Sequence, residues 1–336
     1  MNDRLLAILR CPVCQGVLRS ERGTLRCPAC PKTYPIILGI PDLRVYEDPL
    51  IPLDDDFKKG EKIHAQAATA SFADLVRYYW SLPTDPPTPE SLRHRFVSHV
   101  LTDEERAKGY LHLLGPGGAL LEVGCGTAAL TKAASGKFDF AVGCDVAFRW
   151  LLVARKRLEE AGLPANLVCC CADHLPFAAD SFETVGSVAV LERLDNPRAA
   201  VGEFARVAKS GGRIFSWTAN RFSLAPEPHV RVWGVGFLPR RWMAPYVRRI
   251  RGIAYDKIRL RSRREIYDFC RGAGLDEVSF FLPTITRVDW AHLQGIERVA
   301  AHVFQAASAV PLLAWFLGQV SPVIIFTARV GKSRLR

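Results

Sequence analysis

The 336-residue sequence lacks the marks of several protein classes. Its N-terminus offers only the short apolar run Leu5 to Leu9, against the roughly 7 to 15 residues of a secretory signal peptide, so we do not expect export by that route. Ten cysteines are too few for a disulfide scaffold in a chain of this length. With 49% apolar and 24% charged residues, the composition excludes a disordered, collagen-like or polytopic membrane chain. We expect a cytoplasmic globular protein with one sizeable core and a smaller appendage.

Basic residues outnumber acidic ones, 45 Lys plus Arg against 34 Asp plus Glu, for a net charge of +11. This surplus favours an acidic partner, such as a phosphorylated substrate, nucleic acid or an anionic lipid surface, without choosing among them. It is concentrated between Arg231 and Arg264, where eleven Lys or Arg stand with Asp256 and several aromatic residues. Such a segment can bind phosphate and stack bases, lie at a lipid headgroup boundary, or be a solvated helical face.

Short apolar runs alternate with amphipathic stretches from Ala119 onward, which is typical of an α/β fold with a doubly wound parallel sheet. Residues 1–42 form a separate unit rich in turns and cysteines, and residues 43–118 form a helical connector that carries one helix near 71–80 and another over 92–114. The main domain covers 119–330, with insertions at 221–264 and 286–321. The seven expected strands are 120–123, 140–144, 166–170, 184–188, 213–217, 278–282 and 323–328.

A glycine-rich turn, Gly124-Cys125-Gly126, follows the first of these strands and precedes a helix. Small residues there let a ligand approach the backbone. Asp145 and Asp173 stand at or just after the ends of the next two strands. Because ligands of open parallel sheets bind outside the carboxyl ends of the strands, these acids are placed to accept hydrogen bonds from ribose hydroxyls and an adenine amino group.

Five segments in this order resemble the class I S-adenosylmethionine-dependent methyltransferases: Glu122 to Gly126, Asp145, Asp173 to Phe177, Asp180 to Glu183, and Arg206 to Gly212. The resemblance covers about residues 119 to 220 and implies a seven-stranded Rossmann-like sheet. It also implies that Gly124 and Gly126 pack against the methionine part of the cofactor and that Glu122 supports its amino group. Asp145 would hold the ribose, and Asp173, with Ala172 beside it, the adenine.

This segment departs from the family pattern at two places. Ala128 stands where a third glycine is common and is expected to add a methyl group near the cofactor, and Leu191-Glu192-Arg193 replaces the more usual Leu-Glu-His. A dinucleotide site would need Gly-x-Gly-x-x-Gly, but residue 129 is Ala and the later motifs do not fit such a site.

Two Cys-Pro-x-Cys pairs, Cys11 with Cys14 and Cys27 with Cys30, predict a closed tetrahedral zinc site with a structural role. An empty or redox-active set of cysteines is the alternative. The run Cys11 to Leu43 resembles the small zinc-ribbon activator proteins that accompany tRNA and release-factor methyltransferases, here fused to the enzyme. Such ribbons also precede methyltransferases of other substrates, so we interpret it as a stabilising or docking module. The other six cysteines fit small buried thiols.

Glu227, His229 and Tyr79 are candidates to orient or deprotonate a nucleophile. A sulfonium is already a good leaving group, so methyl transfer needs mainly alignment and removal of a proton, and a base is dispensable in principle. For His229, an ordinary loop histidine is the alternative.

Residues 299–328 contain no Asp, Glu, Lys or Arg. Length alone permits a transmembrane helix, but Pro311, Gly318 and Pro322 interrupt the stretch. We favour a helix followed by a buried final strand, and an interfacial helix near 312–316 stays open.

These patterns predict an S-adenosylmethionine-dependent methyltransferase with a structural Zn²⁺. The favoured acceptor is a small or lipid-linked molecule with an anionic part, and peripheral contact with an anionic membrane stays open. The alternatives are an RNA methyltransferase acting on tRNA or rRNA, and a partner protein that binds the cofactor without turnover.

Overall fold

The computed structural model describes residues 2–83 and 90–331; residues 84–89 of the connector lie outside it. The N-terminal unit contains α1 (Asp3–Ile8) and a four-stranded antiparallel sheet in the order β1-β2-β3-β4. These short strands are β1 (Arg19–Glu21), β2 (Thr24–Arg26), β3 (Thr33–Ile37) and β4 (Ile40–Pro41).

A seven-stranded sheet in the order β10-β11-β9-β8-β5-β6-β7 forms the centre of the molecule. Its strands are β5 (Ala119–Val123), β6 (Phe140–Asp145), β7 (Leu167–Cys169), β8 (Phe182–Val188), β9 (Ala208–Ala219), β10 (Leu275–Phe281) and β11 (Val323–Val330). Strand β11 runs antiparallel to β9 and β10, and the other pairings are parallel. The predicted α/β fold with a doubly wound, seven-stranded sheet is confirmed.

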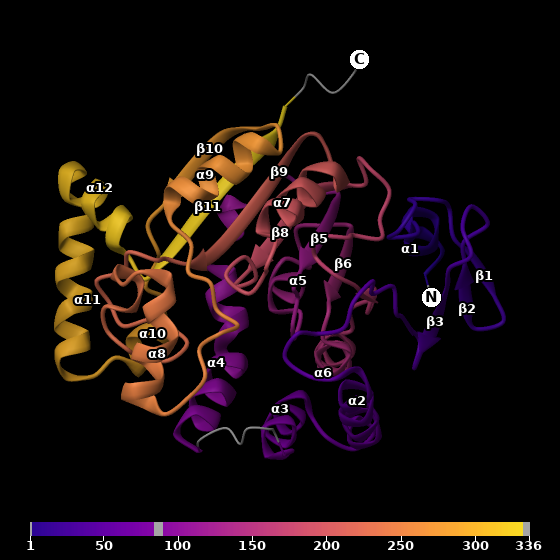
Figure 1. Cartoon of the computed structure of the whole chain (residues 1–336), viewed down its shortest axis with the longest axis horizontal. Coiled ribbons are helices and arrows are strands. Elements are labelled where there is room, and N and C mark those ends of the chain that lie inside the picture. Colours follow the sequence, from indigo (N-terminus) through magenta and orange to yellow (C-terminus); the bar gives the residue numbers. More distant parts are fainter. Residues whose placement is uncertain (1, 84–89, 332–336) are drawn as a thin grey trace.

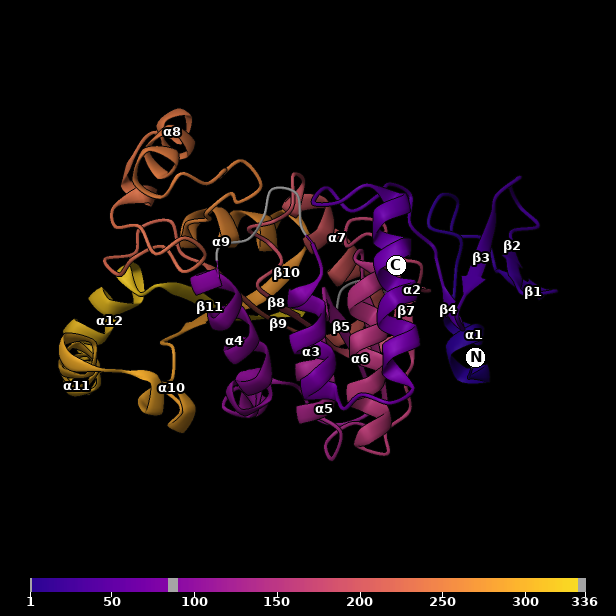
Figure 2. The same cartoon turned by 90° about the horizontal axis from the view of Figure 1, so that it is seen from below.

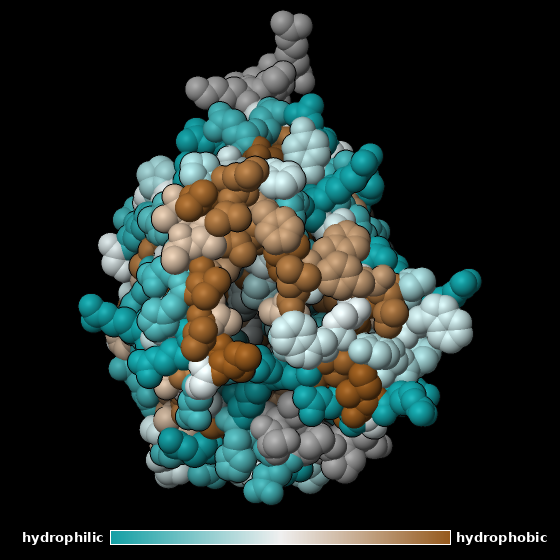
Figure 3. Space-filling view, turned by 90° about the vertical axis from the view of Figure 1, so that its left-hand side faces the viewer, coloured by the Kyte–Doolittle hydropathy of each residue, from teal (hydrophilic) through white to brown (hydrophobic). Residues whose placement is uncertain are grey.

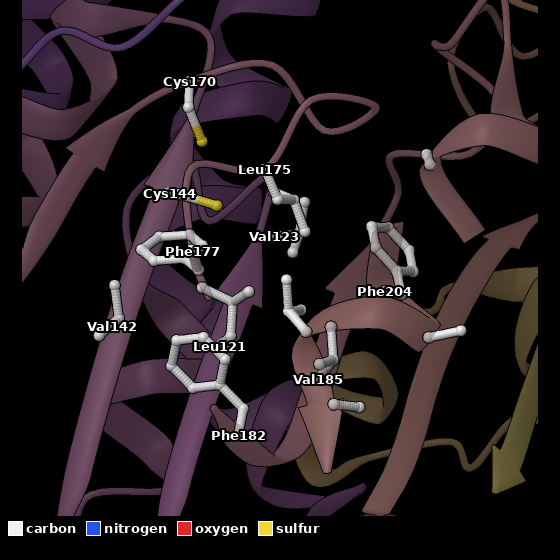
Figure 4. Close-up of a cluster of buried hydrophobic side chains, with 14 of the residues drawn as sticks. Leu121, Val123, Val142, Cys144, Cys170, Leu175, Phe177, Phe182, Val185 and Phe204 are labelled. Carbon is white, nitrogen blue, oxygen red and sulfur yellow. The ribbon is translucent and has the colours of Figure 1, made fainter. Parts of the chain in front are cut away.

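Helices cover both faces of this sheet (Figures 1 and 2). On one face lie α4 (Glu90–Lys108), the 3₁₀ turn η1 (Leu111–Leu113), α5 (Ala129–Ala133) and α6 (Phe148–Glu160). On the other lie α7 (Pro197–Val207) and α9 (Arg263–Gly272). The core between sheet and helices includes Leu121 and Phe204, with the thiols of Cys144 and Cys170 among them (Figure 4). The six cysteines outside the N-terminal pairs are all buried, as expected of small apolar side chains.

The connector holds one more helix than the sequence predicted. Residues 43–91 contain α2 (Leu53–Ala67) in addition to α3 (Phe72–Ser81), and both pack against α6. The acidic run Asp54 to Asp56 begins α2, where carboxylates are favourable because the helix N-terminus carries partial positive charge. Asp56 is fully buried and accepts hydrogen bonds from Arg44 and Arg149, each at 2.8 Å.

The N-terminal unit docks on the β7 edge of the central sheet. The N–H of Leu43 donates to the carbonyl of Cys169 at 2.8 Å, and the N–H of Arg10 donates to that of Pro176 at 2.9 Å. These backbone bonds continue the sheet across the boundary near residue 42, so the edge of β7 is covered by the chain's own N-terminal part.

The two insertions lie at the end of the molecule opposite the N-terminal unit (Figure 1). The first contains the 3₁₀ turn η2 (Val235–Phe237) and α8 (Arg240–Arg251), and the second contains α10 (Arg287–His292), α11 (Gly295–Ser308) and α12 (Pro311–Val320). The expected helix before a buried final strand is present as α12 and β11, although α12 itself buries no side chain. Among the described residues, no helix combines the length and apolar character that crossing a bilayer requires.

Candidate functional site

In the glycine loop between β5 and α5, both glycines have left-handed backbone, Gly124 at φ +68° and Gly126 at φ +49°. A Cβ built on Gly124 would lie 2.1 Å from Cγ2 of Val190, so this glycine permits close packing against the segment after β8. A Cβ on Gly126 would meet no atom of the described residues within 4 Å. Gly126 therefore borders open space in which a ligand can approach the backbone.

Ala128 also adopts left-handed backbone, with φ +58°, and is fully buried. Its methyl group packs in the cluster that contains Phe148 and Leu151. The neighbours Thr127 and Ala129 line the cavity described below, and Ala128 is not in its lining among the described residues. The methyl group of Ala128 therefore lies in the core beside the glycine loop and not on the cavity wall.

Asp145 ends β6 and fixes the shape of the glycine loop. One carboxylate oxygen accepts the N–H of Gly126 and the other accepts the N–H of Ala147, each at 2.8 Å. Burial raises the pKa of Asp145. The acid thus lies beside the loop, where a bound ribose would be within its reach.

Asp173 follows β7 and contacts the connector. Its carboxylate accepts a hydrogen bond from the hydroxyl of Tyr46, and Nδ1 of His174 lies 3.1 Å away. The thiol of Cys171 donates to the carbonyl of Tyr46 at 3.4 Å. The segment around Tyr46 therefore covers the end of β7 next to Ala172 and Asp173, a contact that needs the fold of the connector and that the sequence did not indicate.

A cavity of about 240 Å³ adjoins the glycine loop. Of the predicted cofactor residues, Glu122, Gly124 and Gly126 line it, whereas Asp145, Ala172 and Asp173 are absent from its lining among the described residues. The remaining walls come from α4, α10, the indole of Trp150 and the ends of β8 and β9. The sequence pattern did not single out the α4 side chains, because polar residues on a connector helix look the same as a solvated face.

Glu122 is buried on the floor of this region. Its carboxylate accepts hydrogen bonds from Thr131, at 2.7 Å from the backbone N–H and 2.6 Å from the hydroxyl, and from the N–H of Leu130 at 3.3 Å. Burial, which outweighs these bonds, raises the pKa of Glu122 to about 7. A carboxylate in this position can accept a bond from, and balance the charge of, an ammonium group that enters the cavity.

The α4 wall carries His99 and Arg106, and Tyr110 lines the cavity just after this helix. Nε of Arg106 donates to Asp289 of α10 at 2.7 Å, so an ion pair joins the two helices beside the cavity. Burial and then the positive charge of Arg106 lower the pKa of His99 to about 4. His99 is therefore neutral near pH 7 and available to exchange hydrogen bonds with a ligand.

Two of the predicted catalytic residues contact each other. Nδ1 of His229 lies 2.6 Å from Oε1 of Glu227, and its Nε2 lies 3.7 Å from Oε1 of Glu192. Glu192, just after β8, accepts the hydroxyl of Thr218 on β9 at 2.7 Å. Carboxylates thus flank the His229 ring on both sides, at the carboxyl end of the sheet.

Tyr79, the third candidate, is buried away from this group. Its hydroxyl accepts Nε of Arg149 at 3.0 Å, and its ring stacks on Trp150 with centroids 3.8 Å apart. Burial raises the pKa of Tyr79. Among the described residues, Tyr79, Glu227 and His229 are all absent from the cavity lining, and Tyr79 contacts that lining only by packing on Trp150.

The four N-terminal cysteines form one cluster in which all Sγ atoms lie within 4.8 Å of one another. Sγ of Cys11 lies 3.6 Å from that of Cys30, and Sγ of Cys14 lies 3.4 Å from that of Cys27. Zinc with bonds of about 2.3 Å to four sulfurs needs separations of about 3.8 Å, so the four residues fit this ion. The hydroxyl of Tyr34 lies 3.2 Å from Sγ of Cys11 and can donate to a thiolate there.

Comparison with known proteins identifies the family. Residues 121–216 match a family model described as a methyltransferase domain, and residues 2–39 match one described as Trm112p-like protein. Over 174 residues the chain is 30% identical to a ubiquinone/menaquinone biosynthesis C-methyltransferase of Burkholderia mallei, covering 49% of this chain and 70% of that one. The chain belongs to the S-adenosylmethionine-dependent methyltransferases.

One further relative and one solved structure are also similar to this chain. A ubiquinone biosynthesis O-methyltransferase of an Azoarcus species is 27% identical over 220 residues, or 63% of this chain and 84% of the relative. Among solved structures, phosphoethanolamine N-methyltransferase 2 of Haemonchus contortus is similar with a TM-score of 0.45 and 16% identity, covering 67% of this chain and 52% of that one. The two family-model matches confirm, for both parts of the chain, the resemblance on which the sequence interpretation relied.

Proposed function

We propose that this methyltransferase acts on an O, N or C nucleophile of a small or lipid-linked acceptor that has an anionic part. The observation that carries the proposal is the cavity beside the glycine loop. Phe215, Trp217 and Val188 give it apolar walls, and His99 and the ion pair of Arg106 with Asp289 give it polar groups. Such a mixture suits an acceptor with an apolar body and a charged or polar substituent.

In this proposal Glu122, Gly124, Gly126, Asp145, Ala172 and Asp173 hold S-adenosylmethionine, which when bound supplies an electrophilic methyl group on a positively charged sulfur. Glu122 faces the amino group and Gly126 allows close approach. Asp145 accepts from the ribose, and Asp173, next to Ala172, accepts from the adenine. Tyr46 already donates to Asp173, so the connector shares in this part of the site.

The names of the two curated relatives suggest an acceptor class. Both are assigned by name to ubiquinone biosynthesis, one as an O- and one as a C-methyltransferase. An acceptor from that class agrees with the apolar walls of the cavity. We propose a cytoplasmic location for the reaction.

His229 and Glu227 are proposed to remove the proton that a neutral nucleophile loses on methylation. The bond to Glu227 orients the ring of His229, as expected for a base held by a carboxylate. Tyr79, which is buried away from this pair, is proposed to act only through Arg149 and Trp150, which it contacts.

The test supplies the purified chain with S-adenosylmethionine labelled in the methyl group and, separately, with a lipid extract, a metabolite extract and total RNA. We expect label in the lipid or metabolite fraction. Label in RNA alone would favour the alternative of a tRNA or rRNA methyltransferase. The excess of basic residues and the zinc-ribbon unit are the features that support this alternative. Cofactor binding by calorimetry without turnover on any extract would favour a partner protein that has lost catalysis.

A histidine pair tests the role of His229. His229→Ala should lower kcat by about 100-fold or more if the ring removes the proton. His64→Ala changes an exposed histidine of α2 and should leave the rate unchanged. Equal rates for wild type and His229→Ala across the pH range would show that this histidine is not needed.

A further inference from the structure

Helices α11 and α12 present large apolar side chains to solvent. Ile296 is 84% exposed, Leu312 75% and Trp315 64%. On α11, Ile296 shares one helix face with Val299 and Val303, because these positions are three and four residues apart. No side chain of α12 is buried. Apolar side chains that are exposed as a group, rather than singly, mark an interaction surface.

The basic insertion adds positive charge and aromatic rings. Residues 221–259 contain nine Lys or Arg and two acids, of which Glu227 is buried against His229. On α8 the exposed arginines are Arg240, Arg241, Arg248, Arg249 and Arg251. Trp242 on the same helix is 55% exposed, and Trp233 and Phe237 are exposed just before it.

Two contacts join these parts into one surface. Arg231 of the insertion forms an ion pair with Glu297 of α11, and the N–H of Leu224 donates to the carbonyl of Val320 at the end of α12, at 3.0 Å. Figure 3 shows hydrophobic side chains gathered around a hollow on this side of the molecule. We call α11, α12 and the exposed side chains of 222–251 the amphipathic face.

We propose that the amphipathic face docks on an anionic lipid bilayer. The arginines would contact phosphate headgroups, the tryptophans would lie at the headgroup boundary, and the aliphatic side chains of α11 and α12 would reach the acyl chains. This inference extends the proposed function and rests on it in one respect. If the acceptor is lipid-linked, it would be presented to an enzyme that is already at the bilayer.

The charge of the face disfavours two other occupants. In a twofold contact between copies, each copy uses the same patch, which would bring the α8 arginines of one copy near those of the other. A nucleic acid would pair with the arginines but would leave Ile296, Val299 and Leu312 without an apolar partner. A bilayer matches both the charge and the aliphatic side chains.

Co-sedimentation with vesicles tests the proposal, using the full chain without methyl donor or acceptor. We expect binding to vesicles of mixed phosphatidylcholine and phosphatidylglycerol, weaker binding to phosphatidylcholine alone, and loss of binding as salt rises. Leu312→Ser with Trp315→Ser, and separately Arg248→Glu with Arg249→Glu, should each weaken vesicle binding by at least about tenfold.

Matched variants at the other end of the molecule control for the change in composition. Arg19→Glu with Arg22→Glu makes the same change of charge on exposed residues of the N-terminal unit. Val17→Ser of that unit with Leu50→Ser of the connector removes exposed apolar side chains. Both should bind vesicles as the wild type does. Circular dichroism and thermal unfolding confirm that each variant is folded.

The proposal is overturned by no binding to anionic vesicles at low salt, or by controls that lose as much binding as the test variants. It is also overturned if both test variants still bind vesicles, or if sedimentation velocity shows a dimer that Leu312→Ser with Trp315→Ser dissociates while vesicles are not bound. Since methyl transfer is measured separately, failure of vesicle binding leaves the proposed reaction standing, and the reverse also holds.

Discussion

The carboxylate of Asp145, at the end of β6, accepts the backbone N–H of Gly126 in the neighbouring loop at 2.8 Å. This bond links the tip of one strand to the turn that follows the adjacent strand, so a single side chain sets the shape of the turn. The other oxygen binds the N–H of Ala147 at the start of the segment leading to α6. Asp145 thus holds together both sides of the cofactor region.

Asp145→Asn should weaken cofactor binding. The amide NH₂ would face one of the two N–H donors, so one hydrogen bond is lost and two donors meet, at a cost of about 1 to 3 kcal/mol. We expect the Kd for S-adenosylmethionine, measured by calorimetry, to rise by about tenfold or more. Asp139→Asn changes an exposed carboxylate at the opposite end of β6 and should leave the Kd unchanged. An equal Kd in all three proteins would contradict the role given to Asp145.

Ala128→Gly should be nearly neutral for stability. Relief of the left-handed backbone contributes about 1 to 2 kcal/mol, and the loss of a buried methyl group and the added freedom of glycine together cost about the same. Ala134→Gly removes an equally buried methyl group from a residue at φ −89° and should destabilise the fold by more. Urea unfolding measures both, and an equal loss in the two variants would count against strain at residue 128.

Asp56→Ala should lower the free energy of unfolding by about 3 kcal/mol or more, because it removes the carboxylate shared by two buried arginines. Arg44 and Arg149 each donate to this side chain, as do the N–H groups of Phe148 and Arg149. Asp55→Ala, one residue earlier and exposed, should change stability by less than about 0.5 kcal/mol. Similar denaturation midpoints for the two variants would refute this account.

Glu122 should make stability depend on pH. Its pKa is about 7 in the folded protein, against about 4.3 in an unfolded chain. Between these pH values the carboxyl group of Glu122 therefore binds a proton in the folded state that it has released in the unfolded state. The stability that this proton provides is fully present below about pH 4.3 and is lost as the pH rises through 7. Between these values the wild type should lose stability relative to Glu122→Gln, whose side chain does not titrate. If the free energy of unfolding depended on pH equally in the wild type and in Glu122→Gln across this range, the raised pKa of Glu122 would be contradicted.

Zinc should be bound at one ion per chain and should hold the N-terminal unit together. Mass spectrometry of the metal content should show loss of zinc in Cys14→Ser and retention in Cys270→Ala, which alters a buried cysteine of α9. Removal with a chelator should lower the free energy of unfolding by several kcal/mol, because this small unit has little apolar core of its own. Full stability after the ion is removed would contradict a structural role.

The strands could be predicted from the sequence because each is a short apolar run that glycine, proline or a charged residue bounds. The metal cluster could be predicted as well, since Cys-Pro-x-Cys spacing brings two sulfurs together locally and four of them converge in the structure. Glu122, Gly124 and Gly126 were found in the cavity lining because they stand near the end of a buried strand or directly after it.

The rest of the site depends on packing between distant segments. His99 and Arg106 face the cavity only because α4 crosses the carboxyl edge of the sheet, and no local pattern separates them from solvent-facing residues. The helix at Leu53 was missed because Asp54 to Asp56 resemble a loop, although Asp56 is buried by its two arginine partners. The sequence could not decide whether α12 is buried or exposed, since its apolar composition suits a helix in the core as well as one at the surface.

The backbone bond from Leu43 to Cys169 pairs the β7 edge with a segment of the same polypeptide. A ribbon on a separate chain would have to displace the covalently linked N-terminal unit, whose effective concentration at this edge is on the order of millimolar. The ribbon and the methyltransferase domain are therefore made in a fixed one-to-one ratio, because one chain carries both.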